Sequence, residues 1–160
     1  MQNALERTLL SIARAGVYLA PFIPLIISGS LFFPFITGKN FAFRVIVEII
    51  FASWLLLALR APEFRFRRSL LLWGLAAFLA FIGIADLVGA NPFKSFWSNF
   101  ERMEGYLTLL HLGAYFLVAS SVLNAEKLWL RFFATSVGVS SFLGIYGILQ
   151  LAGKLVINQG

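Results

Sequence analysis

The chain has 160 residues, of which 60% are hydrophobic and 12% are charged, and its mean hydropathy is +0.87. A soluble domain has about 25% charged and about 45–50% apolar residues, so this composition excludes a soluble protein and requires a bilayer. The chain has 13 Lys and Arg against 7 Asp and Glu. The basic residues lie between apolar runs, so they indicate how the chain is oriented in a membrane rather than nucleic-acid binding. The absence of cysteine excludes disulfides, thiolate metal sites and cysteine nucleophiles.

Five apolar stretches approach the roughly 20 residues that a membrane-spanning helix needs. We expect spans at about 15–35, 41–59, 70–88, 106–123 and 132–152. The predicted fold class is therefore all-α, a polytopic transmembrane helix bundle that forms one domain over residues 1–160. Pro21 and Pro24 should kink the first span. That span is too long for the apolar region of a signal peptide, and no A-x-A-like cleavage site follows it.

The distribution of basic residues predicts a cytoplasmic N-terminus. In that orientation the cytoplasmic side holds the larger set, Arg7, Arg14, Arg60, Arg65, Arg67, Arg68, Lys127 and Arg131, and the outer side holds Lys39, Arg44, Lys94, Arg102 and Lys154. Segment 60–68, RAPEFRFRR, is the strongest indicator, because a short loop with four arginines resists translocation. The chain ends in LVINQG without a polar domain, so we expect the N-terminal part of a longer polytopic protein.

The segment between the third and fourth spans, 89–106, reads GANPFKSFWSNFERMEGY and combines rings with polar residues. Gly89 and the pair Asn91–Pro92 predict the end of the third helix. The rings of the segment are typical of an aromatic belt at the depth of the lipid headgroups.

The polar part of this segment, 98–105, is predicted to form a short interfacial helix with Ser98 or Asn99 as its cap. Glu101 and Glu104 would then share one face at i, i+3. Paired carboxylates occur in glycoside chemistry. The alternative is a solvated loop in which these carboxylates pair with Arg102 and Lys94.

The second span contains two ionisable residues, Arg44 and Glu48, one helical turn apart. Such groups are costly at membrane depth and usually face the interior of a bundle, where they pair or have a function. The two side chains could neutralise each other across i, i+4. Alternatively, Arg44 could bind the diphosphate of a lipid headgroup, because a guanidinium forms paired hydrogen bonds with phosphate oxygens.

Two further polar residues lie in apolar surroundings. Asp86, near the end of the third span, could reach water or meet Arg44 or Arg102. His111, in the first turns of the fourth span, is interpreted as a hydrogen-bonded packing residue rather than a catalyst. A lone histidine without a second ligand at zinc spacing argues against a metal site, and we expect no metal and no cofactor.

Residues 33–49, FPFITGKNFAFRVIVEI, and 90–106, ANPFKSFWSNFERMEGY, resemble the N-terminal third of the bacterial O-antigen ligase family, which also includes O-antigen polymerase-like enzymes. The resemblance implies a glycosyltransferase of the bacterial inner membrane with more spans than this chain holds. Members take a glycan from an undecaprenyl-diphosphate carrier on the periplasmic side. They pass it to a glycan or lipid acceptor in lipopolysaccharide and polysaccharide biosynthesis, without a metal.

The resemblance also implies which residues bind substrate. Arg44, Glu48, Glu101 and Arg102 match the family's early motifs, so the resemblance implies that they bind the lipid-linked glycan. The family's histidine lies in a large later loop that this chain does not contain, and His111 does not replace it. The implied partners are the lipid bilayer, the undecaprenyl-diphosphate-linked glycan and its acceptor, without nucleic acid.

Two alternatives remain open from the sequence. A transporter or flippase fragment would share the spans and the intramembrane charges, but Pro21 and Pro24 supply only one of the paired helix breaks expected for inverted repeats. A non-catalytic membrane assembly subunit is supported by Ser136, Ser140 and Gly144, a stripe of small residues on which another helix can pack.

Overall fold

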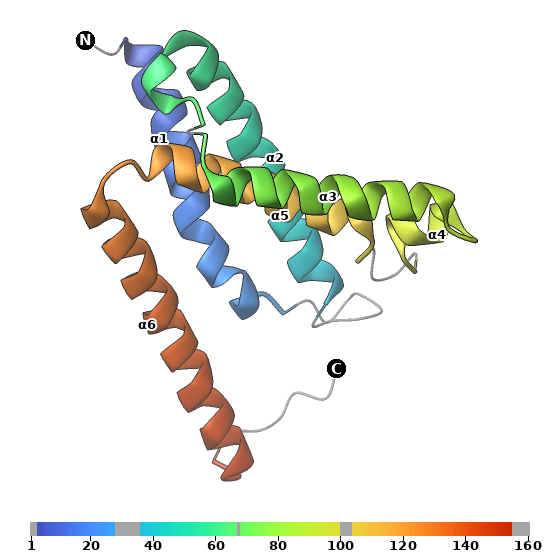
Figure 1. The fold of residues 1–160 in the computed structure, drawn as a ribbon. Coiled ribbons are helices and arrows are strands. Elements are labelled where there is room, and N and C mark those ends of the chain that lie inside the picture. Colours follow the sequence, from blue (N-terminus) through green and yellow to red (C-terminus); the bar gives the residue numbers. More distant parts are fainter. Residues whose placement is uncertain (1–2, 28–35, 67, 100–103, 155–160) are drawn as a thin grey trace.

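The computed structural model describes residues 3–27, 36–66, 68–99 and 104–154. All regular elements in these ranges are helical, which confirms the all-α fold class. In chain order they are α1 (Ala4–Leu19), the 3-10 helix η1 (Ala20–Leu25), α2 (Thr37–Arg60), the 3-10 helix η2 (Pro62–Phe64), α3 (Leu70–Val88), α4 (Pro92–Trp97), α5 (Tyr106–Val122) and α6 (Glu126–Leu151). Figure 1 shows this order from the blue N-terminus to the red α6.

Several of these helices match the dimensions of a bilayer. Within the described ranges, four helical segments are long and apolar enough to cross a membrane, namely Ala4–Leu25, α2, α3 and α6. α5 is apolar but has 17 residues. At about 1.5 Å per residue it covers about 26 Å, slightly less than the roughly 30 Å of a hydrocarbon core. The chain is therefore a helical membrane protein.

The first span begins earlier than the sequence predicted. The expected limits were 15–35, but α1 starts at Ala4 and continues through η1 to Leu25, and residues 28–35 lie outside the described part of the chain. The start is fixed by polar residues, because Glu6 accepts a hydrogen bond from the backbone N–H of Asn3 at 3.0 Å. The α-helix changes to the 3-10 helix η1 at the two prolines that were predicted to kink this span.

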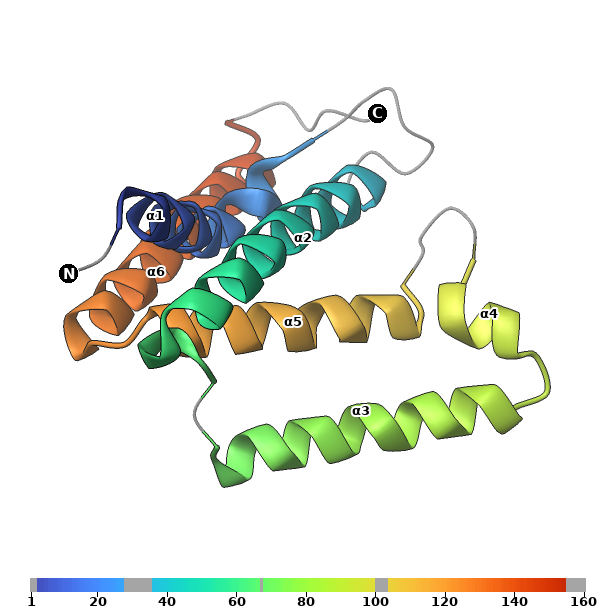
Figure 2. The same cartoon turned by 90° about the horizontal axis from the view of Figure 1, so that it is seen from above.

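The core of the bundle is the contact between α1 and α2, which α5 covers. Gly16 of α1 faces Ile50 of α2 so closely that a Cβ atom at Gly16 would lie 2.1 Å from the Ile50 Cγ2 atom. Val17, Leu57 and Val118 are completely buried in the same cluster. In Figure 2, α5 lies between α2 and α3. α1 and α2 form one layer, α5 packs across both of them, and α3 lies on the far side of α5.

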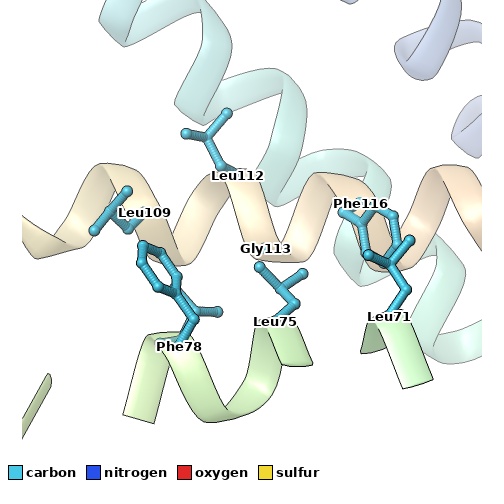
Figure 3. A pocket seen from close by; sticks show the side chains of 8 residues that line it. Leu71, Leu75, Phe78, Leu109, Leu112, Gly113 and Phe116 are labelled. Atoms are coloured by element: carbon cyan, nitrogen blue, oxygen red, sulfur yellow. The ribbon is translucent and has the colours of Figure 1, made fainter. Parts of the chain in front are cut away.

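α3 contacts the rest of the bundle through α5 and leaves most of its surface outside. None of its residues is buried, which suits a helix that faces lipid. Between the two helices runs an apolar groove of about 260 Å³. Figure 3 shows Leu75 and Phe78 of α3 opposite Leu109, Gly113 and Phe116 of α5. Its lining carries no charged residue, so it is a packing feature of a membrane bundle.

Tyr106, the first residue of α5, ties the two helices together. Its hydroxyl donates a hydrogen bond to the carbonyl oxygen of Leu79 at 2.9 Å. We expect Tyr106→Phe to lower the free energy of unfolding by about 1 kcal/mol, because hydrogen bonds between membrane helices contribute about that much. Thermal unfolding in detergent measures the effect. Tyr146→Phe, on the outer surface of α6, is the matched control and should change little; equal losses in both variants would contradict this role of the hydrogen bond.

α6 packs on the bundle with about its first half, where it contacts η1 and where Val139 is buried. The Tyr18 hydroxyl donates to the carbonyl oxygen of Leu128 at 2.7 Å, and the rings of Tyr18 and Phe132 lie 6.2 Å apart. Farther along, a Cβ atom at Gly138 or Gly144 would meet no atom within 4 Å. Within the described part of the chain, no helix therefore packs on the predicted stripe of small residues at Gly144, its last member.

Segment 89–106 contains a short helix that the sequence did not predict. α3 ends at Val88 and Gly89 follows it, as the turn signal indicated. α4 spans Pro92–Trp97 and ends at Ser98, which has a positive φ of 62°. Residues 100–103, the body of the helix predicted at 98–105, lie outside the described part of the chain. The Asn91 side chain caps α4 by accepting a hydrogen bond from the backbone N–H of Lys94 at 3.1 Å. Proline at the first helical position favours this start.

Candidate functional site

A row of polar side chains lies between α2 and α5. The residues are Asn40, Arg44 and Glu48 on α2, and Glu104, Thr108 and His111 at the start of α5. We call these six residues the polar seam. Positions three or four apart lie on one face of a helix, so the three residues of α2 face α5, and Thr108 and His111 of α5 face α2. Glu104 lies just before α5 and extends the row toward Asn40.

The centre of the seam is Arg44. Its side chain is buried, with 8% of its surface exposed, and its Nη2 donates a hydrogen bond to Thr108 Oγ1 at 3.1 Å. At about 1.5 Å per residue, Arg44 lies about 10 Å along α2 from Thr37. The positive charge is therefore held inside the bundle, close to one end of the membrane-spanning helix.

A carboxylate lies on each side of Arg44 along the seam. Toward the helix ends, the Asn40 amide nitrogen lies 3.5 Å from Glu104 Oε1. Deeper in the bundle, Glu48 Oε1 lies 3.5 Å from His111 Nε2, and the Glu48 side chain is 69% exposed. Both distances are long for hydrogen bonds. The seam thus has a buried cation at its centre and two accessible carboxylates at its flanks.

His111 contacts both its own helix and Glu48. His111 Nδ1 lies 2.8 Å from the carbonyl oxygen of Leu107. Because a carbonyl only accepts, Nδ1 carries a hydrogen. His111 Nε2, the other ring nitrogen, faces Glu48 Oε1 at 3.5 Å. His111 is therefore both the hydrogen-bonded packing residue that the sequence predicted and a partner of an ionisable group.

The four residues predicted to bind substrate are only partly placed. Arg44 and Glu48 lie together on the seam and each contacts α5. Glu101 and Arg102 lie outside the described residues. Asp86 lines a different groove, of about 370 Å³, together with residues of α3, α4 and Tyr106.

The sequence interpretation missed the partners of Arg44 and Glu48. Asn40 and Thr108 received no role, and Glu104 was considered only as a neighbour of Glu101. The available signal was spacing: Asn40, Arg44 and Glu48 recur every four residues in a span, as polar positions facing another helix do.

In the described part of the chain, no group of three or more His, Asp or Glu side chains is placed to hold a metal ion. The chemistry that the seam offers is thus that of a guanidinium, two carboxylates, an imidazole and two neutral polar groups. It can bind and orient an anionic group and hydrogen-bond to hydroxyls.

Comparison of the chain with protein-family models, with curated proteins and with solved structures finds no match. The resemblance of 33–49 and 90–106 to the O-antigen ligase family therefore stays a prediction.

Proposed function

We propose that the polar seam binds the diphosphate of a lipid-linked glycan, and that the chain belongs to a membrane glycan transferase of the O-antigen ligase type. The observation that carries the proposal is the buried Arg44 between α2 and α5. Burying a charge in a membrane bundle is costly and usually marks a functional site. A guanidinium suits phosphate in particular, because its N–H groups match two phosphate oxygens.

The flanking carboxylates have a role in the same proposal. Glu48 and Glu104 are exposed, so they can accept hydrogen bonds from sugar hydroxyls while Arg44 binds the diphosphate. Negative charges on both sides also keep the diphosphate over the guanidinium, because they repel it elsewhere along the seam. In this proposal the seam binds and orients the donor, and no residue of the seam is assigned to the transfer step.

We place this protein in the bacterial inner membrane, with the N-terminus in the cytoplasm and the seam toward the periplasm. The support is the distribution of arginines: Figure 1 shows the N-terminus and loop 61–69 at the same end of the bundle, and this loop carries Arg65, Arg67 and Arg68. Basic loops remain on the cytoplasmic side. The seam starts at the opposite end of α2.

A photoreactive undecaprenyl-diphosphate sugar tests where the donor binds. Irradiation of the protein in nanodiscs, followed by digestion and mass spectrometry, should label peptides from 36–60 and 104–122. An excess of unmodified undecaprenyl diphosphate should prevent the labelling. Labelling confined to α6, or labelling that the excess does not reduce, would contradict the proposal.

A proton-coupled transporter is a second candidate, favoured by the pairing of Glu48 with His111, whose Oε1 and Nε2 atoms lie 3.5 Å apart. Chains of carboxylates and histidines in membrane helices form proton relays. Proteoliposomes with an internal pH dye distinguish the two candidates. The transferase proposal predicts no proton flux above empty liposomes, for the wild type or for Glu48→Gln. The transporter candidate predicts a flux in the wild type that Glu48→Gln abolishes.

A further inference from the structure

A second apolar groove lies at the opposite end of the bundle from the polar seam. It has a volume of about 410 Å³ and lies between the end of α2 and the start of α3. Trp54 and Leu55 line it from α2, Leu72 and Trp73 from α3, and Phe66 and Arg68 from the loop between these helices. Figure 2 shows this loop joining the two helices at one end of the bundle.

The wall of this groove is held in place by the loop. The Trp54 indole N–H donates to the carbonyl oxygen of Phe64 at 2.9 Å, and Arg65 Nε donates to the carbonyl oxygen of Ala58 at 3.0 Å. Ala61 and Phe64 are buried at 5% and 2% exposure. These contacts fix the path of the chain up to Arg65, so the groove is a formed feature of the bundle.

The positive charge of Arg68 lies at the end of the groove next to the start of α3. Arg68 is the charged residue among those that line it, and it comes two residues before Leu70, where the apolar run of α3 begins. The acidic residue of the loop, Glu63, lines a different pocket together with Arg65 and Glu126. The start of α3 adds a partial positive charge, and the Ser69 hydroxyl caps it by accepting a hydrogen bond from the backbone N–H of Leu72 at 3.1 Å.

We infer that this groove binds an anionic phospholipid, with an acyl chain along the apolar wall and the phosphate beside Arg68. The groove matches a phospholipid from tail to headgroup, because its apolar wall inside the membrane leads to Arg68 at the membrane surface. Trp73 lies where an interfacial tryptophan contacts the upper part of an acyl chain. Basic residues between membrane helices on the cytoplasmic side are typical sites for anionic headgroups. The inference does not depend on the proposed transferase activity.

Quenching of tryptophan fluorescence by brominated lipids tests this site. The full chain carries Trp97→Phe and Trp129→Phe, so the remaining tryptophans, Trp54 and Trp73, both line the groove. This double variant is reconstituted in phosphatidylcholine vesicles. One sample contains a small fraction of brominated phosphatidylglycerol, and a second sample contains the same fraction of brominated phosphatidylcholine. We expect phosphatidylglycerol to be enriched at the groove about five-fold, the effect typical of one basic residue near the surface.

Two variants in the same background separate a specific site from general attraction. Arg68→Gln should remove the difference in quenching between brominated phosphatidylglycerol and brominated phosphatidylcholine. Arg68→Lys should keep most of this difference. Lys127→Gln, an exposed basic residue at the start of α6, should leave the difference unchanged. Equal quenching by both lipids in the unsubstituted background, or a preference that survives Arg68→Gln, would overturn the inference. So would protection from both brominated lipids, which would indicate that a protein segment fills the groove.

Discussion

Replacing Arg44 with glutamine is expected to weaken binding of an undecaprenyl-diphosphate-linked glycan about 10- to 100-fold. The reason is the loss of charge-assisted hydrogen bonds, each of which contributes about 1.5–3 kcal/mol. Arg44→Lys should have an intermediate effect, because an ammonium retains the charge but not the paired geometry. Equilibrium binding to the protein in nanodiscs measures these affinities.

Two control variants separate the charge of Arg44 from its structural contact. Thr108→Val removes a hydrogen-bond partner of Arg44 but leaves the guanidinium in place. Its affinity for the lipid-linked glycan should therefore fall less than that of Arg44→Gln. Arg131→Gln removes an exposed arginine on α6 and should not affect binding. If Arg44→Gln binds the lipid-linked glycan as the wild type does, the seam is not the phosphate site.

Replacing Gly16 with alanine is expected to destabilise the bundle by about 1–3 kcal/mol, the usual cost of overpacking a core. The added Cβ atom would lie 2.1 Å from Ile50 Cγ2 and 3.4 Å from Ile46 Cγ2. Ile50 is 1% exposed and has no free space to move into, so α1 and α2 must separate. Unfolding by steric trapping in a bilayer or thermal unfolding in detergent measures the loss.

Gly138→Ala is the matched control, because it makes the same substitution in a membrane helix where the new Cβ atom meets nothing within 4 Å. We expect this variant to be unchanged or slightly stabilised, since alanine restricts the unfolded chain. Ile50→Ala should relieve part of the clash in the double variant with Gly16→Ala. Equal stability of the two glycine variants would show that α1 and α2 do not pack as closely as described.

The helical class and most helix positions followed from apolar runs, because long apolar segments have few stable forms in a bilayer. The end of α3 followed from Gly89 and Asn91–Pro92, residues whose backbone preferences act locally. The start of α1 was missed because its first three turns carry Glu6, Arg7 and Arg14 and are not apolar throughout. The pairing of Asn3 with Glu6 was the local signal that marked it.

The sequence predicted site residues only where a charged residue lies within an apolar helix. Arg44 and Glu48 were identified because charges are rare in spans, but their partners lie about sixty residues away along the chain. Spacing within α2 indicates which face is polar, not which helix covers it. That choice depends on the packing of α5 across α1 and α2, which local sequence does not encode.

The measurement that tests the central claim most directly compares two ligands with the same hydrocarbon chain. Undecaprenyl diphosphate and undecaprenol are titrated into the wild-type protein in nanodiscs, and their dissociation constants are compared. If the seam recognises the diphosphate through Arg44, the protein should prefer undecaprenyl diphosphate by at least about tenfold. Equal affinities would mean that the chain binds only the hydrocarbon, and the proposed role of the seam would be wrong.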